Sequence, residues 1–287
     1  MEPEAFICGQ HSFEGRGQQG FEGRGQHSFE GRLERERLHY NRMARRAAAN
    51  SLWMQEDNIR RYHGPSATTP FPLEYAFHLL GPLDRRTVVD LGCGDGLNTV
   101  ILAALGADVI SVDISDDSLR LTEERARVNK VEQNVTLVQS DAAEIPVESG
   151  TADMVLCAAI LHHVDCIAAA RQIHRLLKPG GRAVFLEPLM GPNFFSAIKD
   201  KLPRTVNVTE DERPLTRQQV AGVSCTVGVH GRNRVFGLTM RMVTRIGVRS
   251  WPVIRASHRL DAWTLRNIPY TAPLASPLVW EAKKRDQ

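Results

Sequence analysis

The sequence predicts a doubly wound α/β fold, in which a mostly parallel sheet ends in an antiparallel strand and carries an added helical cap. Two observations support this prediction. From residue 81 onward, short apolar runs alternate with stretches of helical spacing, a pattern typical of parallel strands joined by right-handed helical crossovers. The 287 residues, 42% of them hydrophobic and 24% charged, are also sufficient to bury a substantial core.

An eight-residue repeat occupies the N-terminal part of the chain, with units that begin at His11, Gln19 and His27. Each unit is polar, rich in glycine and carries one Phe. Such units bury too little apolar surface to offset the entropy of ordering the backbone. Residues 1–32 are therefore predicted to be a disordered tail, with an Arg/Gly segment that contacts a partner as the alternative.

Residues 33–80 are predicted to form the helical cap. Residues 33–50 are rich in Arg and Ala, a composition that favours helices. Residues 73–80 form a second, short apolar helix, which ends before Gly81 and Pro82 because proline cannot continue it.

The main domain is predicted to span residues 81–287. A last strand is expected at residues 278–282, and residues 189–268 are expected to be an insertion on the substrate side. The other strands are expected at residues 87–91, 108–113, 135–139, 154–157 and 182–186, and the helices between them at residues 97–105, 115–129 and 165–177.

Glycines follow the first of these strands in Asp90-Leu-Gly-Cys-Gly-Asp-Gly96. In a doubly wound sheet, ligands bind beyond the carboxyl ends of the strands, and Gly92 and Gly94 allow the backbone to turn sharply beside a ligand. A dinucleotide site has glycine at the third position of its GxGxxG fingerprint, where this chain has Leu97. Asp90 is also a poor neighbour for pyrophosphate and a good partner for an ammonium group.

Two more acids follow the next strands in the same register. Asp113 ends the second strand and can accept hydrogen bonds from both hydroxyls of a ribose. Asp141 follows the third strand, where its carboxylate can accept the amino group of adenine while the Ala142 amide bonds a ring nitrogen. Three acids at three successive strand ends predict a pocket for a nucleoside linked to an amino acid.

The stretch from Val88 to Gly181 resembles the class I S-adenosylmethionine-dependent methyltransferases, in particular those of the ubiquinone and menaquinone type. Asp90 to Gly96 matches the first motif of that family, and residues 176–181, Leu-Leu-Lys-Pro-Gly-Gly, match its turn before the fifth strand. The resemblance implies a Rossmann-like sheet and S-adenosylmethionine as cofactor. The cofactor-binding residues expected on this basis are Asp90, Gly92, Cys93, Gly94, Gly96, Asp113, Ile114, Asp141, Ala142 and Ala158.

The resemblance implies methyl transfer to O, N or C of a small molecule. This chemistry needs little beyond alignment of the reacting groups, although a general base accelerates it where the acceptor must lose a proton. The candidate bases are His162 and His163, which follow the fourth strand, and Glu187, which ends the fifth. An apolar acceptor pocket could be lined by Phe194, Phe195, Trp251 and Trp263, with a place in the core as the alternative for each. An acidic acceptor could meet Arg241, Arg245, Arg249 and Arg255, which a solvated helix face would explain equally well.

Charge and cysteine content narrow the remaining function classes. A net charge of +3 without a basic stripe does not indicate a nucleic-acid partner. Five cysteines without a CxxC pair predict neither a metal site nor a disulfide framework. With no signal peptide and no apolar stretch of membrane-spanning length, the sequence predicts a cytoplasmic protein. The two functional alternatives are a non-catalytic binding module of the same fold and an NAD-dependent oxidoreductase.

Overall fold

The computed structural model describes residues 34–35, 37–44, 52–191, 213–240, 243, 248 and 250–286. Several expectations concern residues outside these ranges and stay predictions. They are the disordered repeat tail over residues 1–32 and the candidate acceptor contacts Phe194, Phe195, Arg241, Arg245 and Arg249.

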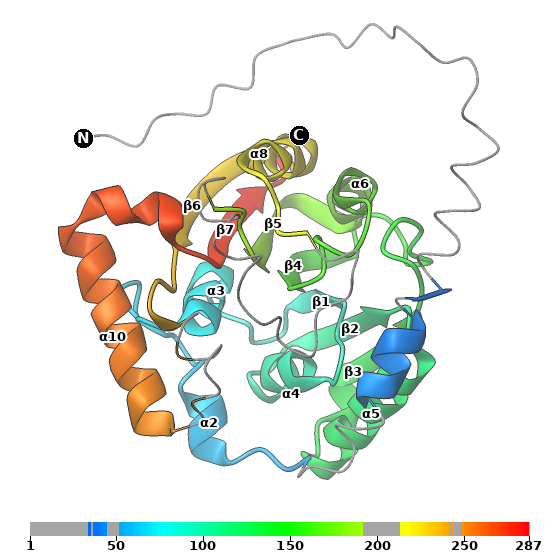
Figure 1. Ribbon diagram of the computed structural model, residues 1–287. Helices are drawn as coiled ribbons and strands as arrows, with labels where there is room; N and C mark the ends of the chain where they lie inside the picture. The colour runs from blue at the N-terminus through cyan, green and yellow to red at the C-terminus, as the bar shows by residue number, and fades with distance from the viewer. Residues whose placement is uncertain are drawn as a thin grey trace, which may run out of the picture.

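A seven-stranded sheet forms the centre of the described part of the chain, in the order β3-β2-β1-β4-β5-β7-β6 (Figure 1). The first five strands are paired in parallel. β7 lies between β5 and β6 and is antiparallel to both, which confirms the predicted parallel sheet with an antiparallel C-terminal strand. The strands are β1 Thr87–Leu91, β2 Asp108–Asp113, β3 Val135–Gln139, β4 Ala152–Ala158, β5 Leu177–Glu187, β6 Val229–Val235 and β7 Leu278–Lys283.

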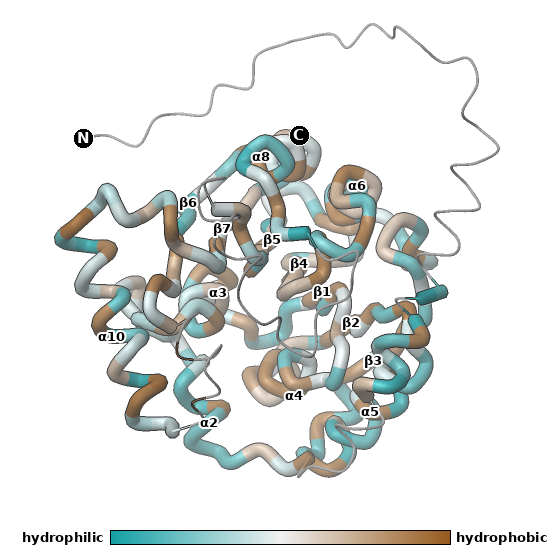
Figure 2. The backbone as a smooth tube through the Cα atoms, in the orientation of Figure 1, coloured by the Kyte–Doolittle hydropathy of each residue, from teal (hydrophilic) through white to brown (hydrophobic). Residues whose placement is uncertain are grey.

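Helices cover both faces of the sheet. The alternation of side chains along β1 divides the core into two clusters, because Val89 packs with residues of α6 and α8 while Val88 packs with residues of α3 and α4. In Figure 2 the tubes of α4 and α6, one from each cluster, include stretches in the brown of hydrophobic residues. The helices are α2 Glu56–Arg60, α3 Pro72–Leu80, α4 Leu97–Ala104, α5 Asp116–Val128, α6 Cys166–Leu176, α8 Arg217–Val227 and α10 Trp251–Asn267, with 3-10 turns η1 Glu132–Asn134 and η2 Pro269–Leu274. Residues 37–44 are also helical.

Side-chain caps fix where the helices begin. The Ser115 hydroxyl accepts the Ser118 amide at the start of α5, and Asp165 accepts the amides of Ile167 and Ala168 at the start of α6. Both caps were expected from the sequence. They hold the carboxyl ends of β2 and β4 in place, because each cap lies in the loop that follows its strand.

The C-terminal third of the chain differs from expectation. The sequence analysis assigned no strand to Val229–Val235, yet this segment is β6, the last strand of the sheet on that side. Its residues are mostly polar and none is buried, so the strand lacks the alternation of apolar and polar side chains by which strands are predicted. β6 and α8 lie inside residues 189–268, and the substrate-side role of that range remains a prediction.

None of the described helices combines the length and the apolar character that crossing a bilayer requires.

Candidate functional site

A cavity opens at the carboxyl ends of β1, β2 and β3, where the sequence predicts the ligand. Its wall includes six of the expected cofactor-binding residues, which are Gly92, Gly94, Asp113, Ile114, Asp141 and Ala142. The side chain of His163 lies in the same wall. The loops after three consecutive strands therefore contribute to one cavity.

Asp90 precedes the wall residue Leu91 and is almost fully buried, with 1% of its surface exposed. Oδ2 accepts a hydrogen bond from the Thr99 hydroxyl at 2.7 Å, whereas Oδ1 has no hydrogen-bond partner among the described residues. Burial raises the pKa of Asp90 to about 7, and the negative charges of Asp113 and Asp95 add to the increase. The arrangement favours a positive charge in the cavity, which would stabilise the carboxylate.

Asp113 is held by two backbone amides. Oδ2 accepts the Gly94 amide and Oδ1 accepts the Ser115 amide, each at 2.9 Å. Burial raises the pKa of Asp113, and these two bonds oppose the increase. The carboxylate is thus fixed in orientation at the cavity wall, and each oxygen keeps a second lone pair that can accept a hydroxyl.

The glycines of the loop serve two different purposes. Gly94 has a φ of 56° and nothing within 4 Å of the position of a Cβ, so its backbone borders open space. Gly96 has a φ of 78°, and a Cβ there would come within 2.7 Å of the Thr122 Cα. Gly96 therefore allows α4 and α5 to pack closely, while Gly94 leaves room beside the cavity.

Cys93 and Ala158 lie outside the cavity wall. Cys93 is buried with its Sγ 3.6 Å from the Thr122 hydroxyl, and burial raises its thiol pKa well above the ordinary range. Ala158 ends β4, and its neighbour Ala159, with a φ of 60°, lines the cavity instead. A backbone with positive φ at a non-glycine residue is not visible in the sequence, which explains the difference of one position.

Asp141 and Ala142 lie at the far side of the cavity, after β3. Asp141 Oδ1 accepts the Ala143 amide at 3.1 Å, so the carboxylate closes a tight turn directly after the strand. Ala142 is buried beside it. Both residues are placed as the sequence expectation requires, at the cavity and in the β3 loop.

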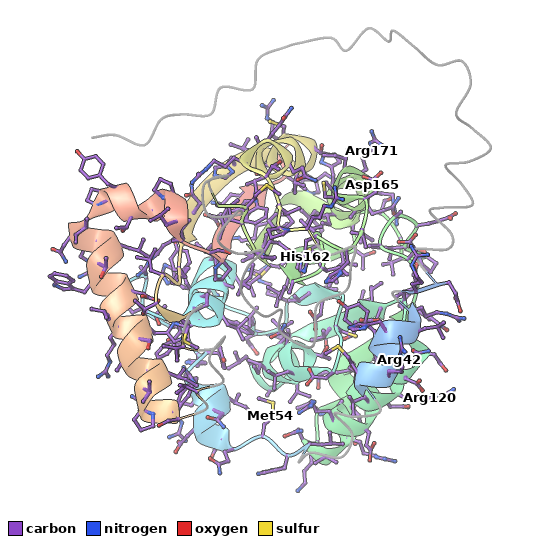
Figure 3. The ribbon with its side chains drawn as sticks, viewed as in Figure 1. Arg42, Met54, Arg120, His162, Asp165 and Arg171 are labelled. Atoms are coloured by element: carbon purple, nitrogen blue, oxygen red, sulfur yellow. The ribbon has the colours of Figure 1, made fainter. Side chains whose placement is uncertain are left out.

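Glu187 organises the loop after β4. Its Oε1 accepts the amides of Ile160 and Leu161, both at 2.8 Å, and its Oε2 lies 2.7 Å from Nδ1 of His162. Figure 3 shows His162 in this loop, between β4 and Asp165 at the start of α6. Every polar atom of the buried Glu187 side chain is used, so this residue acts on the site by holding His162 and the loop.

His162 and His163 occupy different surroundings although their rings lie 4.0 Å apart. His163 lines the cavity already described, and His162 lines a second one with Arg213, Thr216 and Gln219. Val164 belongs to the wall of both cavities, which places them next to each other.

The N-terminal helix at residues 37–44 covers one side of the first cavity. Its Tyr40 lines the cavity and lies 2.8 Å from Nε2 of His163, while Asn41 Oδ1 accepts the Ser115 hydroxyl at 2.5 Å. Tyr40 was not a candidate in the sequence analysis, because one tyrosine in an Arg- and Ala-rich helix carries no signal of its distant partner.

No group of three or more His, Cys, Asp or Glu side chains in the described part of the chain has a geometry suited to a metal ion.

The comparisons with known proteins bear on the family and the fold. A family model described as a methyltransferase domain matches residues 89–185, from β1 to β5. The ubiquinone biosynthesis O-methyltransferase of Bordetella avium is 33% identical over 156 residues, which cover 52% of this chain and 61% of that protein. Over residues 89–185 the chain is therefore similar to the methyltransferase domain family. The chain spans 55% to 61% of the length of the B. avium protein and of three further relatives with the same name.

Solved structures show the same fold at low sequence identity. Geranyl diphosphate C-methyltransferase from Streptomyces coelicolor A3(2), in complex with Mg2+, geranyl diphosphate and S-adenosyl-L-homocysteine, has a TM-score of 0.60 at 16% identity. The match covers 88% of this chain and 98% of that one. The [4+2]-cyclase SpnF has a TM-score of 0.50 at 16% identity, with coverage of 71% and 76%. Because a cyclase and a methyltransferase share it, the fold alone does not determine the reaction.

Proposed function

We propose that this protein binds S-adenosylmethionine in the first cavity and transfers its methyl group to O, N or C of a small-molecule acceptor. The observation that carries the proposal is the set of acids at the ends of β1, β2 and β3, since Asp113 and Asp141 line one cavity and the buried Asp90 directly precedes Leu91 of its wall. The match of residues 89–185 to a methyltransferase domain supports the same conclusion.

The residues present fit this cofactor. S-adenosylmethionine carries a sulfonium and an ammonium group and no phosphate. A cavity with two half-buried carboxylates, and no described arginine or lysine, in its wall suits this charge, and the buried Asp90 lies close to the wall residue Leu91 in the sequence. The buried Oδ1 of Asp90, which has no partner among the described residues, is the atom that most needs a cation nearby. When bound, the cofactor supplies a methyl group activated by its positive sulfur.

We assign the cofactor-side roles residue by residue. Asp113 would accept the ribose hydroxyls, and Asp141 with the Ala142 amide would bind adenine. Gly92, Gly94 and Ile114 would line the bound cofactor. Asp90, Cys93, Gly96 and Ala158 lie outside the wall, so their part would be to shape the loops and, for Asp90, to supply negative charge.

The second cavity is the proposed acceptor site, because it adjoins the first at Val164. His162 is the better candidate for a general base, since Glu187 Oε2 lies 2.7 Å from its Nδ1 and would orient the ring, much as a carboxylate orients the imidazole of a catalytic triad. His163, hydrogen-bonded to the Tyr40 hydroxyl, would instead help to close the cofactor cavity. Alignment of acceptor and cofactor would supply the rest of the rate.

A cytoplasmic location also remains a proposal. The buried Cys93, Cys157 and Cys166 are free thiols, as is usual in a reducing compartment. Of the functional alternatives, an oxidoreductase is disfavoured by Leu97 at the third fingerprint position, which begins α4. An assay of methyl transfer is needed to distinguish a non-catalytic binding module from an enzyme.

Calorimetric titration of the full chain with S-adenosylmethionine and S-adenosylhomocysteine tests cofactor binding. Asp113→Ala should lower the affinity for both by about thirtyfold or more, since it removes charge-assisted hydrogen bonds. Asp108→Ala, at the exposed start of the same strand, is the matched control and should bind normally. Folded wild-type protein that fails to bind at millimolar cofactor would disprove the proposal.

Methyl transfer itself requires a separate assay. A screen of phenols, carboxylic acids and amines with a labelled methyl donor should yield a labelled product with the wild type, and a lower yield with Asp113→Ala. Tight cofactor binding without product from any acceptor class would favour the binding module.

A further inference from the structure

In α10 some polar side chains are buried and several apolar side chains are exposed, the reverse of the usual arrangement in a surface helix. Its residues Ser257 and Asp261 are buried, and the Asp261 carboxylate accepts the backbone amides of Leu238, Thr239 and Met240 at 2.8 to 3.1 Å. The side of the helix that faces the protein is thus anchored by polar contacts. Figure 1 shows α10 at the edge of the molecule, with one long side away from the sheet.

The outward side of α10 carries apolar side chains. Val253, Leu260 and Trp263 are spaced by seven and three residues, which places them on one face of the helix. Leu260 is 52% exposed and Trp263 is 59% exposed, and Tyr270 in η2 is 88% exposed. We call this set, with Ile268 between helix and turn, the α10 patch. In place of lining an apolar pocket, Trp263 therefore faces outward, and so does Trp251 at 49% exposure.

A row of arginines lies beside the patch. Arg255, Arg259 and Arg266 are exposed and are spaced by four and seven residues, so they form a second stripe along the same outward side. The single acid between residues 250 and 275 is Asp261, which faces inward. The outward side therefore combines an apolar stripe, including a Trp, with three arginines that form no ion pair with any residue in the described part of the chain.

We propose that the α10 patch docks on the surface of an anionic lipid bilayer. A helix that lies in the membrane interface has this composition, with Trp and Leu entering the boundary between headgroups and acyl chains while Arg contacts lipid phosphates. The arrangement concerns a membrane surface only and requires no spanning segment. The membrane proposal does not depend on the proposed methyl transfer, and its test is separate.

The charge beside the α10 patch favours an anionic bilayer over a second copy of the chain or a nucleic acid. A second copy of the chain, docked by the same face, would bring two rows of arginines together and would meet like-charge repulsion. A nucleic acid would satisfy the arginines, yet its phosphates would cover the apolar stripe with charge. An anionic bilayer satisfies both stripes at once.

Co-sedimentation with vesicles tests the proposal, using phosphatidylcholine alone and an equal mixture of phosphatidylcholine and phosphatidylglycerol. The full 287-residue chain should bind the mixed vesicles, with a blue shift of tryptophan emission, and bind neutral vesicles far more weakly. The triple variant Arg255→Gln, Arg259→Gln, Arg266→Gln should lose on the order of a hundredfold in affinity for the mixed vesicles. Leu260→Ser with Trp263→Ser should lose about tenfold or more.

The matched control removes three exposed arginines elsewhere, in Arg85→Gln, Arg120→Gln and Arg127→Gln, and should bind as the wild type does. Because every substituted side chain is exposed, melting temperatures should stay within a few degrees of the wild type. Equal loss in the control, equal binding to neutral vesicles, or no binding at all would overturn the proposal. A wild type that forms a dimer and does not bind vesicles, with the dimer lost in the variant Leu260→Ser with Trp263→Ser, would show that a second copy of the chain occupies the patch and would also overturn the proposal.

Discussion

The Tyr40 hydroxyl and Nε2 of His163 lie 2.8 Å apart, although 123 residues separate them in the sequence. Tyr40 belongs to the helix at residues 37–44, and His163 to the loop after β4. Their rings meet edge to face with centroids 5.5 Å apart. This contact joins the N-terminal helix to the carboxyl ends of the strands and closes one side of the first cavity.

A double-mutant cycle measures what that contact contributes. Tyr40→Phe and His163→Gln should each lower the free energy of unfolding, and the two effects should be coupled by about 1 kcal/mol, the usual net value of one hydrogen bond. Urea unfolding of the two single variants and the double variant gives the coupling. Tyr270→Phe, at an exposed position, should change nothing. Strictly additive effects would show that the two residues do not stabilise each other.

Glu187→Gln tests the proposed role of His162. The amide oxygen can still accept the Ile160 and Leu161 amides, but the NH2 group then faces Nδ1 of His162 and favours the ring tautomer with its proton on Nε2. The rate with an acceptor that must lose a proton should fall by roughly 100- to 10,000-fold. Cofactor affinity, measured by calorimetry, should change little, and an unchanged rate would remove His162 from the mechanism.

Asp90 should affect stability and cofactor binding in opposite directions. Its pKa is about 7 in the folded protein and near 3.8 in the unfolded chain, so the unfolded chain gives up this proton more readily. The resulting penalty on folding is absent below about pH 4, grows as the pH rises and is complete above about pH 7. Asp90→Asn removes this penalty.

We therefore expect Asp90→Asn to be more stable than the wild type at pH 8, by up to about 4 kcal/mol, and little changed at pH 4. The same variant should bind S-adenosylmethionine more weakly, because the negative charge is lost. Urea unfolding at the two pH values and calorimetry supply both measurements, with Asp108→Asn as the exposed control. A stability difference that does not grow with pH would contradict the raised pKa.

The two glycines of the loop should respond differently to alanine. Gly96→Ala forces a Cβ to within 2.7 Å of the Thr122 Cα and should destabilise the protein by about 2 kcal/mol or more. Gly94→Ala places its Cβ in open space and should cost only the left-handed backbone strain, about 1 to 2 kcal/mol. Its main effect should be weaker cofactor binding. Thermal melts measure the loss of stability and titrations measure the loss of cofactor affinity. Equal losses of both in the two variants would contradict the different roles assigned to Gly94 and Gly96.

The strands that carry the first cavity could be predicted because local signals agreed. Buried parallel strands read as apolar runs, and caps such as Ser115 and Asp165 mark the helices that follow them. Asp113 ends β2 and Asp141 lies in the loop after β3, so topology brings both to one edge of the sheet. This part of the site depends on residues close to each other in the sequence.

The features that could not be predicted depend on distant contacts. Tyr40 and Glu187 reach the loop after β4 from other parts of the chain, and neither the partner of Tyr40 nor the division of the two histidines between two cavities leaves a local pattern. β6 was missed because its sequence is polar and its pairing partner, β7, begins 43 residues later, at Leu278.

The position of β7 between β5 and β6 has a consequence for synthesis of the chain. β6 is made first, yet in the described sheet its sole neighbour is β7. On the ribosome, residues 229–235 must therefore wait without a strand partner until residues 278–283 have emerged. Only then can this later segment pair with both strands, so this edge of the sheet is completed after β5 and β6 have both been made.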